Sequence, residues 1–338
     1  MVKAKQYAAV DIAKYVSALL VVAIHTYPFL EISETFNTLF IAIVCRLAVP
    51  FFFVSSGYFL FRKLNGTKKQ NLNRLKKYLW RLISLYLVWT VIYIPYTIWN
   101  YMSEGFSLIS LAGWIRDFFL NGSYYHLWFL PALITGTLIV YLIGEKKRIS
   151  KVVFISMILY FIGYLINVYA PIWQSLPYVS IVYGFFTKTL VTARDGFFFA
   201  PIFIALGAYM AKMPRPKLKA SCVGFAASFL LLIIEVMTYY SLGILQDLSC
   251  MFLSLVPTTY FLMNLLLDVK MEYKPVYGDL RKDSTLIYVS HILFARLLLL
   301  VLPEAHLVVY LATLAFSSMF AFLVIRYRKQ IPWLKYLM

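Results

Sequence analysis

The chain has 338 residues, of which 62% are hydrophobic, and its formal net charge is +18. A mean hydropathy of +0.78 and repeated apolar stretches of about twenty residues are typical of a polytopic membrane protein and exclude a soluble one. Nucleic-acid binding, which so basic a chain would otherwise suggest, is not expected because the basic residues collect between the apolar stretches.

The apolar stretches predict an all-α, polytopic membrane fold with about ten transmembrane helices. Their approximate bounds are 8–29, 37–61, 79–101, 126–144, 151–169, 195–211, 219–241, 247–267, 284–302 and 305–325. If both termini are cytoplasmic, 26 of the 32 Lys and Arg lie in inner segments, as the positive-inside rule requires. We therefore expect residues 1–338 to form a single integral membrane domain with no soluble domain.

Two further apolar stretches, 106–120 and 177–192, are not counted as spans. Adding either one alone would turn the basic loops that follow it outward. We interpret both as outer-surface or re-entrant segments that cover an outward opening. The three cysteines are widely spaced in apolar surroundings, so the sequence predicts neither a disulfide framework nor a metal site.

The first span carries three ionisable residues, Asp11, Lys14 and His25. Lys14 and His25 are eleven residues apart, which returns almost to the same helix face about 16 Å further along. Asp11 precedes Lys14 by three residues, so the two side chains can pair. Such groups are costly in lipid, so this stripe is expected to face a protein cavity. A structural histidine that ties two helices together is the alternative for His25, but general-base catalysis is favoured.

The second span contains Arg46 four residues before Pro50. Pro50 opens the helical turn and frees the carbonyl oxygen of Arg46, so an arginine and a loose carbonyl share one place. Arg46 is equally compatible with a catalytic site near His25 and with a structural pair, for example with Glu235.

Several other residues are candidates for polar contacts. His126 and Trp128 open span four, where aromatic residues either form an interfacial belt or stack on a sugar. Arg194 and Asp195 open span six and either bind a polar acceptor or form a surface ion pair. The remaining intramembrane polar candidates are Glu235, His291 and Arg296.

The inner loop 62–81 is the most basic stretch of the chain. Positive-inside topology explains most of its charge. Arg74, Lys77 and Arg81 nevertheless recur at spacings of three and four, and if the helix starts early they form one cationic face suited to phosphates.

Taken together, these motifs resemble acyltransferase family 3, a family of integral membrane O-acyltransferases. The resemblance is carried by Lys14-x10-His25, Arg46 before Val49-Pro50-Phe51-Phe52-Phe53 and Ser56-Gly57, Leu127-Trp128-Phe129-Leu130, and Tyr288 with His291. Tyr125-His126-Leu127-Trp128 and Arg194-Asp195-Gly196-Phe197-Phe198 look closest to the membrane domain of VanT-type serine racemases and to stand-alone Gram-positive relatives. The likeness covers nearly the whole chain.

The resemblance implies a membrane enzyme of the bacterial plasma membrane. It would move an acyl group, often acetyl, from cytoplasmic acyl-CoA to a hydroxyl of an extracytoplasmic glycan, lipid-linked or cell-wall acceptor. His25 would be the essential histidine, acting as base or covalent carrier, with Lys14, Asp11 and Arg46 beside it. The Arg74 to Arg81 cluster would meet CoA phosphates, with acyl-CoA as co-substrate and no permanently bound cofactor.

An alternative function is transport. The chain shows no pyridoxal-phosphate racemase domain, so racemase activity is not expected. In VanT-type proteins the membrane domain is associated with serine uptake, which makes a carrier for serine or another small polar solute the competing hypothesis. Carriers often have paired halves with broken helices, and the sequence shows no such correspondence.

Overall fold

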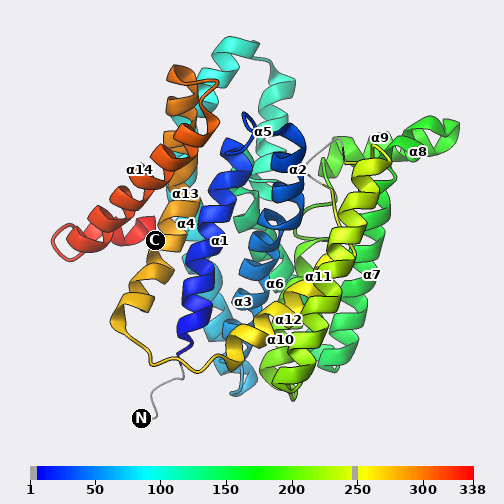
Figure 1. The fold of residues 1–338 in the computed structure, drawn as a ribbon, viewed down its shortest axis with the longest axis vertical. Helices are drawn as coiled ribbons and strands as arrows, with labels where there is room; N and C mark the ends of the chain where they lie inside the picture. Colours follow the sequence, from blue (N-terminus) through cyan, green and yellow to red (C-terminus); the bar gives the residue numbers. More distant parts are fainter. Residues whose placement is uncertain (1–5, 246–249) are drawn as a thin grey trace. The chain divides into compact units, whose positions relative to one another are not determined.

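The computed structural model describes residues 6–245 and 250–338, and all regular structure within these ranges is helical. Eight helices or helix pairs in the described part are long and apolar enough to cross a membrane: Ala8–Thr26, Glu34–Phe61, Lys68–Ser103, Tyr125–Lys146, Ile149–Val168, Leu218–Ser241, Pro275–Val301 and His306–Tyr327. The prediction of an all-α polytopic membrane protein is confirmed. The helices are drawn in Figure 1.

The chain divides into two compact units, and the division falls inside one helix. Unit 1 is built from the described parts of Met1–Ser55, Pro214–Leu248 and Ser254–Met338, and unit 2 from Ser56–Met213 and the described part of Ser249–Leu253. Each unit is described on its own terms below.

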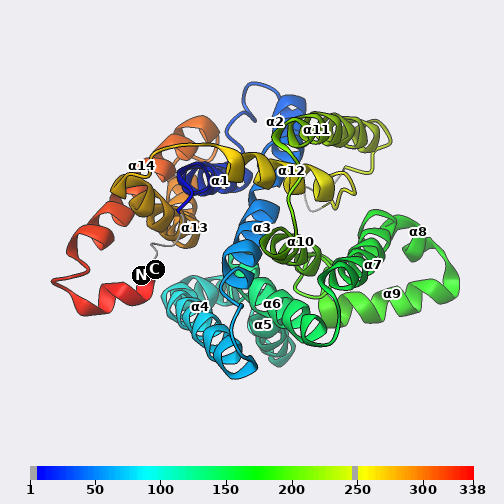
Figure 2. The ribbon, with the colours of Figure 1, turned by 90° about the horizontal axis from the view of Figure 1, so that it is seen from below.

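Unit 1 is organised around the first helix, α1. Its helices are α1 (Ala8–Thr26), α2 (Glu34–Ile43), the 3-10 turn η1 (Cys45–Leu47), the start of α3 (Ala48–Phe61), α11 (Leu218–Ser241), α12 (Leu255–Asp268), α13 (Pro275–Val301), α14 (His306–Tyr327) and the 3-10 helix η3 (Pro332–Leu337). α1 packs against α12, α13, α14 and η1. The end-on view in Figure 2 shows α1 beside α13 and α14.

Apolar side chains hold α1 in this position. Ala18 and Val22 form one buried cluster with Ile287 of α13, and Ala23 forms a second with Ile41 and Cys45. Burying small and branched side chains in this way leaves little room for the α1 backbone to shift, because protein interiors are close-packed. The polar residues of α1 are therefore held at fixed positions along α13.

Unit 2 contains the remainder of the chain. Its helices are the rest of α3, α4 (Lys68–Glu104), α5 (Leu108–Leu120), the 3-10 turn η2 (Tyr125–Trp128), α6 (Phe129–Lys146), α7 (Ile149–Val168), α8 (Ala170–Ser175), α9 (Pro177–Leu190) and α10 (Ala200–Lys212). α10 is buried along most of its length and packs on α6 and α7. At Gly57 of α3 a Cβ atom would lie 2.4 Å from the carbonyl oxygen of Ile204, so this close approach of α3 to α10 requires glycine.

Two of the ten predicted spans are shorter than expected. The stretch 195–211 forms α10, whose 13 residues are about 20 Å long and fall short of the roughly 30 Å hydrocarbon core. The stretch 247–267 corresponds to the 14-residue α12, and residues 246–249 lie outside the described part. Apolar, non-helical residues precede both helices, and hydropathy does not distinguish these from helix.

The two apolar stretches that were not counted as spans are helices in unit 2. Residues 106–120 contain α5 and residues 177–192 contain α9, and neither helix has a buried residue. Figure 1 shows α8 and α9 running across the end of α7. Their helical, surface character agrees with the interpretation from the sequence, and their side of the membrane stays a prediction.

Candidate functional site

The polar stripe of α1 is present in unit 1. Asp11 lies in the first turn of α1 and is buried, whereas Lys14 and His25 are half-buried. An acid in the first turn is favoured by the helix dipole. The stripe therefore combines one buried carboxylate with two partly accessible groups.

His25 lies against a second histidine, His291, on the neighbouring helix α13. The centroids of the two imidazole rings are 5.3 Å apart and the rings are inclined by 36°. His291 is fully buried, and its Nδ1 lies 2.7 Å from the carbonyl oxygen of Tyr288 and 3.1 Å from that of Ile287. A carbonyl oxygen only accepts, so Nδ1 of His291 carries a proton and its Nε2 is the basic nitrogen of the neutral ring. The sequence motif placed both histidines in the family pattern, and the structure brings them into contact.

Asp11 is bound by two residues that sequence reasoning missed. Its Oδ2 accepts hydrogen bonds from the hydroxyl of Tyr273 at 3.1 Å and from Nη1 of Arg281 at 3.4 Å. Tyr273 lies before α13 and is separated from Asp11 by 262 positions. Burial, followed by the nearby Asp11 carboxylate, raises the pKa of Tyr273, so this hydroxyl is protonated and donates. Asp11 near the start of α1 contacts Arg281, and His25 near its end contacts His291, which lies further along α13. The two helices therefore run parallel.

Arg46 lies in the interruption that Pro50 was expected to cause. The 3-10 turn η1 separates α2 from α3, and Arg46 is its buried middle residue. The preceding residue, Cys45, is in one cluster with Ala23, two positions before His25. The turn therefore holds Arg46 near the level of His25 along α1.

Glu235 has a structural role that the sequence did not reveal. Its Oε2 accepts a hydrogen bond from the backbone N–H of Ser254 at 2.9 Å and another from the hydroxyl of the same serine. Its Oε1 accepts from the hydroxyl of Tyr239. Ser254 precedes α12, so the carboxylate caps and neutralises the positive end of that helix. These hydrogen bonds account for the Glu235 carboxylate without the pairing with Arg46 that the sequence suggested.

Arg296 is exposed on α13, five residues before the helix ends at Val301. That position is about 8 Å from the end of the helix. A long side chain at this distance from the helix end reaches the membrane interface.

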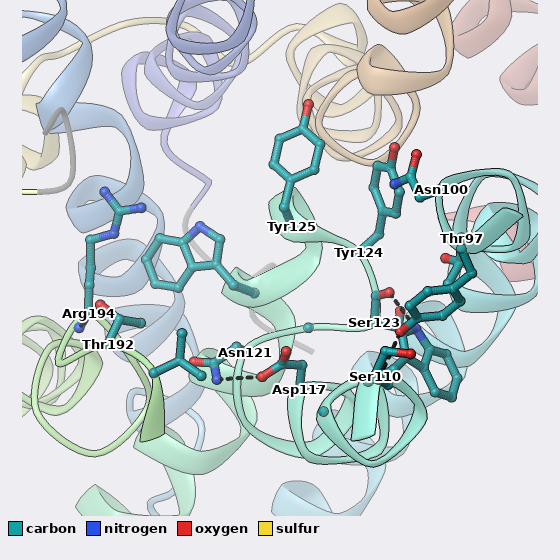
Figure 3. Close-up of a pocket in the computed structure, with 16 residues that line it drawn as sticks. Thr97, Asn100, Ser110, Asp117, Asn121, Ser123, Tyr124, Tyr125, Thr192 and Arg194 are labelled. Carbon is teal, nitrogen blue, oxygen red and sulfur yellow. Dashed lines mark hydrogen bonds between the residues drawn. The ribbon is translucent and has the colours of Figure 1, made fainter. Parts of the chain in front are cut away.

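A pocket of about 470 Å³ lies in unit 2 (Figure 3). It is walled by the end of α4, by α5, by residues 121–128 and by residues 191–194. Aromatic and neutral polar side chains dominate its lining: Thr97, Asn100, Tyr101, Ser110, Trp114, Asn121, Ser123, Tyr124, Tyr125, Trp128 and Thr192. Asp117 and Arg194 are the ionisable acid and base among the lining residues described.

Local hydrogen bonds shape this pocket. The backbone N–H of Ser123 donates to the Tyr86 hydroxyl at 2.7 Å, and that hydroxyl donates to the carbonyl of Phe118 at 2.6 Å. The indole of Trp114 donates to the carbonyl of Ser123 at 3.0 Å. Gly122 has φ +93°, and a Cβ there would lie 2.5 Å from the backbone nitrogen of Trp128, so only glycine fits this turn.

Two of the four predicted acceptor-binding residues line the pocket together. The guanidinium carbon of Arg194 lies 5.1 Å from the centroid of the Trp128 ring, which is a cation–π contact. His126 is buried behind the wall, with its ring 4.8 Å from that of Tyr93. Sequence position alone did not separate His126 from Trp128, because both lie in the same short turn.

Asp195, the fourth predicted residue, points into the protein. Its Oδ1 accepts from the backbone N–H groups of Phe197 and Phe198, both at 2.8 Å, so it shapes the turn before α10. Its buried Oδ2 has no hydrogen-bond partner among the residues described. Burial raises the pKa of Asp195 to about 7, although the backbone donors oppose the shift.

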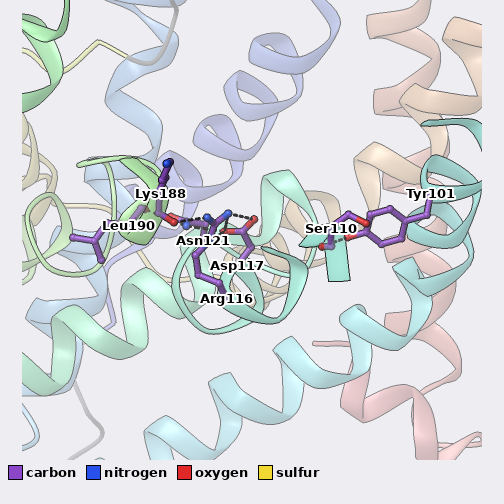
Figure 4. A network of polar contacts seen from close by, with 7 residues as sticks. All are labelled: Tyr101, Ser110, Arg116, Asp117, Asn121, Lys188 and Leu190. Carbon is purple, nitrogen blue, oxygen red and sulfur yellow. Dashed lines mark hydrogen bonds and ion pairs between the residues drawn. The ribbon is translucent and has the colours of Figure 1, made fainter. Parts of the chain in front are cut away.

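A polar clasp joins α5 to the end of α9 (Figure 4). Arg116 contacts Asp117 through Nε and Nη2, both at 3.0 Å, and its Nη1 donates to the carbonyl of Lys188 at 2.7 Å. The amide of Asn121 donates to Asp117 and to the carbonyl of Leu190. These contacts fix one wall of the pocket.

The second half of the basic loop 62–81 forms the start of α4. This is the early helix start that a shared cationic face of Arg74, Lys77 and Arg81 requires. Thr67 and Gln70 form a capping box that begins α4 at Lys68. Arg74, Lys77 and Arg81 then lie on an exposed helical face. Arg74 also donates to Asn65 at 2.9 Å and to the carbonyl of Lys63.

In the described ranges, no group of three or more His, Cys, Asp or Glu residues is placed to hold a metal ion. Unit 1 contains the α1 stripe together with His291 and Arg46, and unit 2 contains the pocket and the cationic face of α4. Tyr273, Arg281, Asp117 and Tyr124 are the site residues that the sequence did not single out. An acid at 117, inside an apolar stretch, was the available signal for the pocket.

Comparisons with known proteins agree with these features. The family model described as an acyltransferase domain, acyltransferase family 3, matches residues 7–327. An amino-acid racemase from Enterococcus faecalis is 34% identical over 270 residues, which are 80% of this chain and 37% of that protein. A serine/alanine racemase from Enterococcus gallinarum is 29% identical over 263 residues, 76% of this chain and 37% of that protein.

The chain thus spans well under half the length of these relatives. No solved structure matches it. The family match covers the α1 stripe, the pocket and almost everything between them, and it confirms the resemblance inferred from the motifs. The chain belongs to acyltransferase family 3.

Proposed function

We propose that this protein is a cell-membrane acyltransferase that moves an acyl group, often acetyl, from cytoplasmic acyl-CoA to a hydroxyl of an extracytoplasmic acceptor. The observation that supports it most directly is the contact between His25 and His291, with the tautomer of His291 held by the carbonyl of Tyr288. Two adjacent imidazoles among apolar helices are suited to proton transfer near neutral pH.

In the proposed reaction, His25 removes the proton from the acceptor hydroxyl as its oxygen attacks the thioester carbonyl. The carbon–sulfur bond then breaks, and His25 returns the proton to the departing CoA thiolate, so that an ester and free CoA are formed. His291 stabilises the charged form of His25 through its basic nitrogen. In a two-step variant, His25 carries the acyl group before the acceptor arrives.

Lys14 and Arg46 supply positive charge in this proposal. The carbonyl oxygen of the thioester becomes negative in the transition state, and a preorganised cation lowers the energy of that charge. The half-buried Lys14 lies on the same stripe as His25, and η1 holds Arg46 near its level. Asp11 orients the start of the stripe through Arg281 and Tyr273 rather than reacting itself.

The residues that we propose to bind the substrates lie in unit 2. The exposed face of Arg74, Lys77 and Arg81 is the proposed dock for the phosphates of CoA, since clustered cations bind phosphate. The pocket around Trp128 and Arg194 is the proposed acceptor site. Its aromatic faces and amide groups suit a hydroxyl-bearing molecule such as a sugar.

The test is incubation of purified, reconstituted protein with radiolabelled acetyl-CoA. We expect thioester turnover that requires His25, with His25→Ala inserted and folded but inactive. His306→Gln is the matched control, because His306 contacts the α1 carbonyl of Thr26 instead of the reactive stripe. Turnover retained in His25→Ala would remove His25 from the mechanism.

A carrier for serine or another small polar solute is the second candidate. The names of the two Enterococcus relatives, an amino-acid racemase and a serine/alanine racemase, favour an amino acid as cargo. Flux of labelled serine into liposomes in the absence of acyl-CoA would support the carrier, and its absence alongside histidine-dependent turnover would support the enzyme.

A further inference from the structure

The pocket of unit 2 contains polar atoms that the protein leaves unsatisfied. The hydroxyl of Tyr124 and the carbonyl oxygen of the Asn121 side chain are buried and have no hydrogen-bond partner among the residues described. Tyr124 is 6% exposed, and both residues line the pocket (Figure 3). Burying a polar group without a hydrogen-bond partner is unfavourable, so these atoms favour a ligand that donates to Asn121 and bonds to the Tyr124 hydroxyl.

The acid that lines the pocket is already paired within the protein. The carboxylate of Asp117 already receives both Nε and Nη2 of Arg116 and the amide of Asn121. Its charge is therefore balanced within the protein. The guanidinium carbon of Arg194 lies 5.1 Å from the centroid of the Trp128 ring, so the lining presents an aromatic and neutral polar surface that suits hydroxyl groups.

The helix that walls this pocket has two different faces. Ser110, Gly113, Trp114 and Asp117 of α5 line the pocket. Leu108 and Phe119 of the same helix are 78% and 66% exposed. At about 100° per residue, the exposed apolar side chains lie roughly half a turn from the pocket face. α5 is therefore polar toward the pocket and apolar on its outer side.

The helix at the other end of the clasp has a matching apolar face. Tyr178, Ile181, Val182 and Phe185 of α9 follow the spacing of one helical stripe, and each is at least 69% exposed. The clasp formed by Arg116 and Asn121 fastens this helix to the pocket wall (Figure 4). In a membrane protein, short helices with such faces lie against acyl chains.

We propose that the pocket receives the hydroxyl-rich headgroup of a membrane-anchored amphiphile, whose lipid chains lie along the apolar faces of α5 and α9. The proposal rests on the proposed acyltransferase function and narrows its acceptor to a lipid-linked one. The headgroup hydroxyls pair with Tyr124 and Asn121. The acceptor thus reaches the protein from within the bilayer.

This arrangement has an energetic advantage over a soluble acceptor. The chains of an amphiphile remain in the bilayer, so binding orders only the headgroup and carries a smaller entropy cost. The high local concentration of lipid-anchored molecules in the membrane adds to this effect in the way that linked binding sites do.

The first experiment tests whether one face of α5 contacts lipid chains and the other faces the pocket. Single cysteines are placed at Gly113 and at Phe119 in a Cys222→Ser background, since Cys222 is exposed and Cys45 and Cys250 are buried. A Cβ at Gly113 meets nothing nearer than an Arg116 nitrogen at 4.0 Å, so Gly113→Cys fits. With bimane attached in nanodiscs, lipids brominated on their chains should quench the label at 119 and not at 113. Quenching of the 119 label by aqueous iodide instead would overturn the proposal.

The second experiment tests the ligand with phosphatidylglycerol as the probe, because its headgroup carries two hydroxyls and the headgroup of phosphatidylcholine carries none. In phosphatidylcholine nanodiscs, adding phosphatidylglycerol should shift the emission of the Gly113 label in a saturable way. Glycerophosphoglycerol, the same headgroup without chains, should require at least ten times the concentration. Gly184→Cys on α9, where a Cβ meets open space outside the pocket, is the control and should not respond.

A single-atom variant separates specific binding from general charge. Tyr124→Phe removes the hydroxyl and keeps the ring that stacks on Tyr93, so it should weaken the response about fivefold. Tyr178→Phe on the exposed face of α9 should not change it. Equal potency of the chain-free headgroup, or no saturable response to the lipid, would overturn the proposal. His25-dependent acetyl-CoA turnover, measured on the same sample, shows separately whether the acyltransferase function stands.

Discussion

The centroids of the imidazole rings of His25 and His291 lie 5.3 Å apart across the interface of α1 and α13. One histidine is half-buried, and the other is fully buried with its Nδ1 proton held by the Tyr288 carbonyl. Two neighbouring imidazoles repel when both are protonated, so the buried His291 remains neutral when His25 takes up a proton. In the proposed reaction His25 is the base and His291 is its positioning partner, although the two residues are more than 260 positions apart in the sequence.

Replacing these histidines should have unequal effects. His25→Ala is expected to lower transfer by a factor of about 10³, within the range of general-base contributions. His291→Asn is expected to lower kcat by about tenfold and to shift the pH profile of kcat, because the basic Nε2 of His291 no longer stabilises the charged form of His25. Steady-state kinetics from pH 5 to 9 provide the measurement. An unchanged pH profile in His291→Asn would contradict the positioning role.

Removing the cationic face of α4 should affect substrate binding and leave the chemistry intact. Lys77→Ala and Arg81→Ala are each expected to raise the KM for acetyl-CoA by about threefold to tenfold with kcat unchanged, since they bind ground state and transition state alike. The effect should diminish as salt is raised. Lys219→Ala, an exposed lysine at the start of α11, is the control. An equal change in the control would assign the effect to net charge alone.

The contacts of Asp11 should show energetic coupling. Arg281→Met and Tyr273→Phe are each expected to destabilise the protein by about 1 kcal/mol, a modest value because Arg281 is half-exposed. In an Asp11→Asn background both losses should shrink, because the acceptor charge is already gone. Thermal unfolding of the single and double variants in detergent measures the coupling. Fully additive losses would indicate that the contacts contribute nothing.

The cap on α12 should be a source of stability independent of catalysis. Glu235→Ala leaves the backbone N–H and hydroxyl of Ser254 without their acceptor, and the expected loss is about 1 to 3 kcal/mol. Tm should fall by several degrees, whereas kcat of the folded fraction should be unchanged. A variant with normal Tm and no turnover would instead place Glu235 in the reaction.

The stability of the protein should depend on the protonation of Asp195. Its folded-state pKa is about 7, whereas an unfolded Asp has a pKa of about 3.9, so the folded state binds a proton more tightly. Stability should therefore be greatest below about pH 4 for this group and decline as pH rises to about 7. Asp195→Asn should lack that decline and exceed wild type in Tm at pH 8. Parallel Tm curves for the two proteins would refute the prediction.

Local patterns were enough to predict most of the membrane fold. A stretch of some twenty apolar residues must satisfy its backbone internally in lipid, so eight spans were visible without any tertiary information. The break at Arg46 and the early start of α4 were also predictable, because Pro50 and the Thr67 capping box act through neighbouring residues. α10 and α12 were overestimated because buried, non-helical apolar residues have the same hydropathy as helix.

The site depended on contacts that no local pattern contains. The spacing of Lys14 and His25 predicted a polar stripe, yet the partners of that stripe, Tyr273, Arg281 and His291, come from the far end of the chain. His126 and Trp128 belong to one turn, and only packing decided that one is buried and the other lines the pocket. Short-range geometry follows from the order of residues along the backbone, whereas which distant side chains meet is decided by how the helices pack.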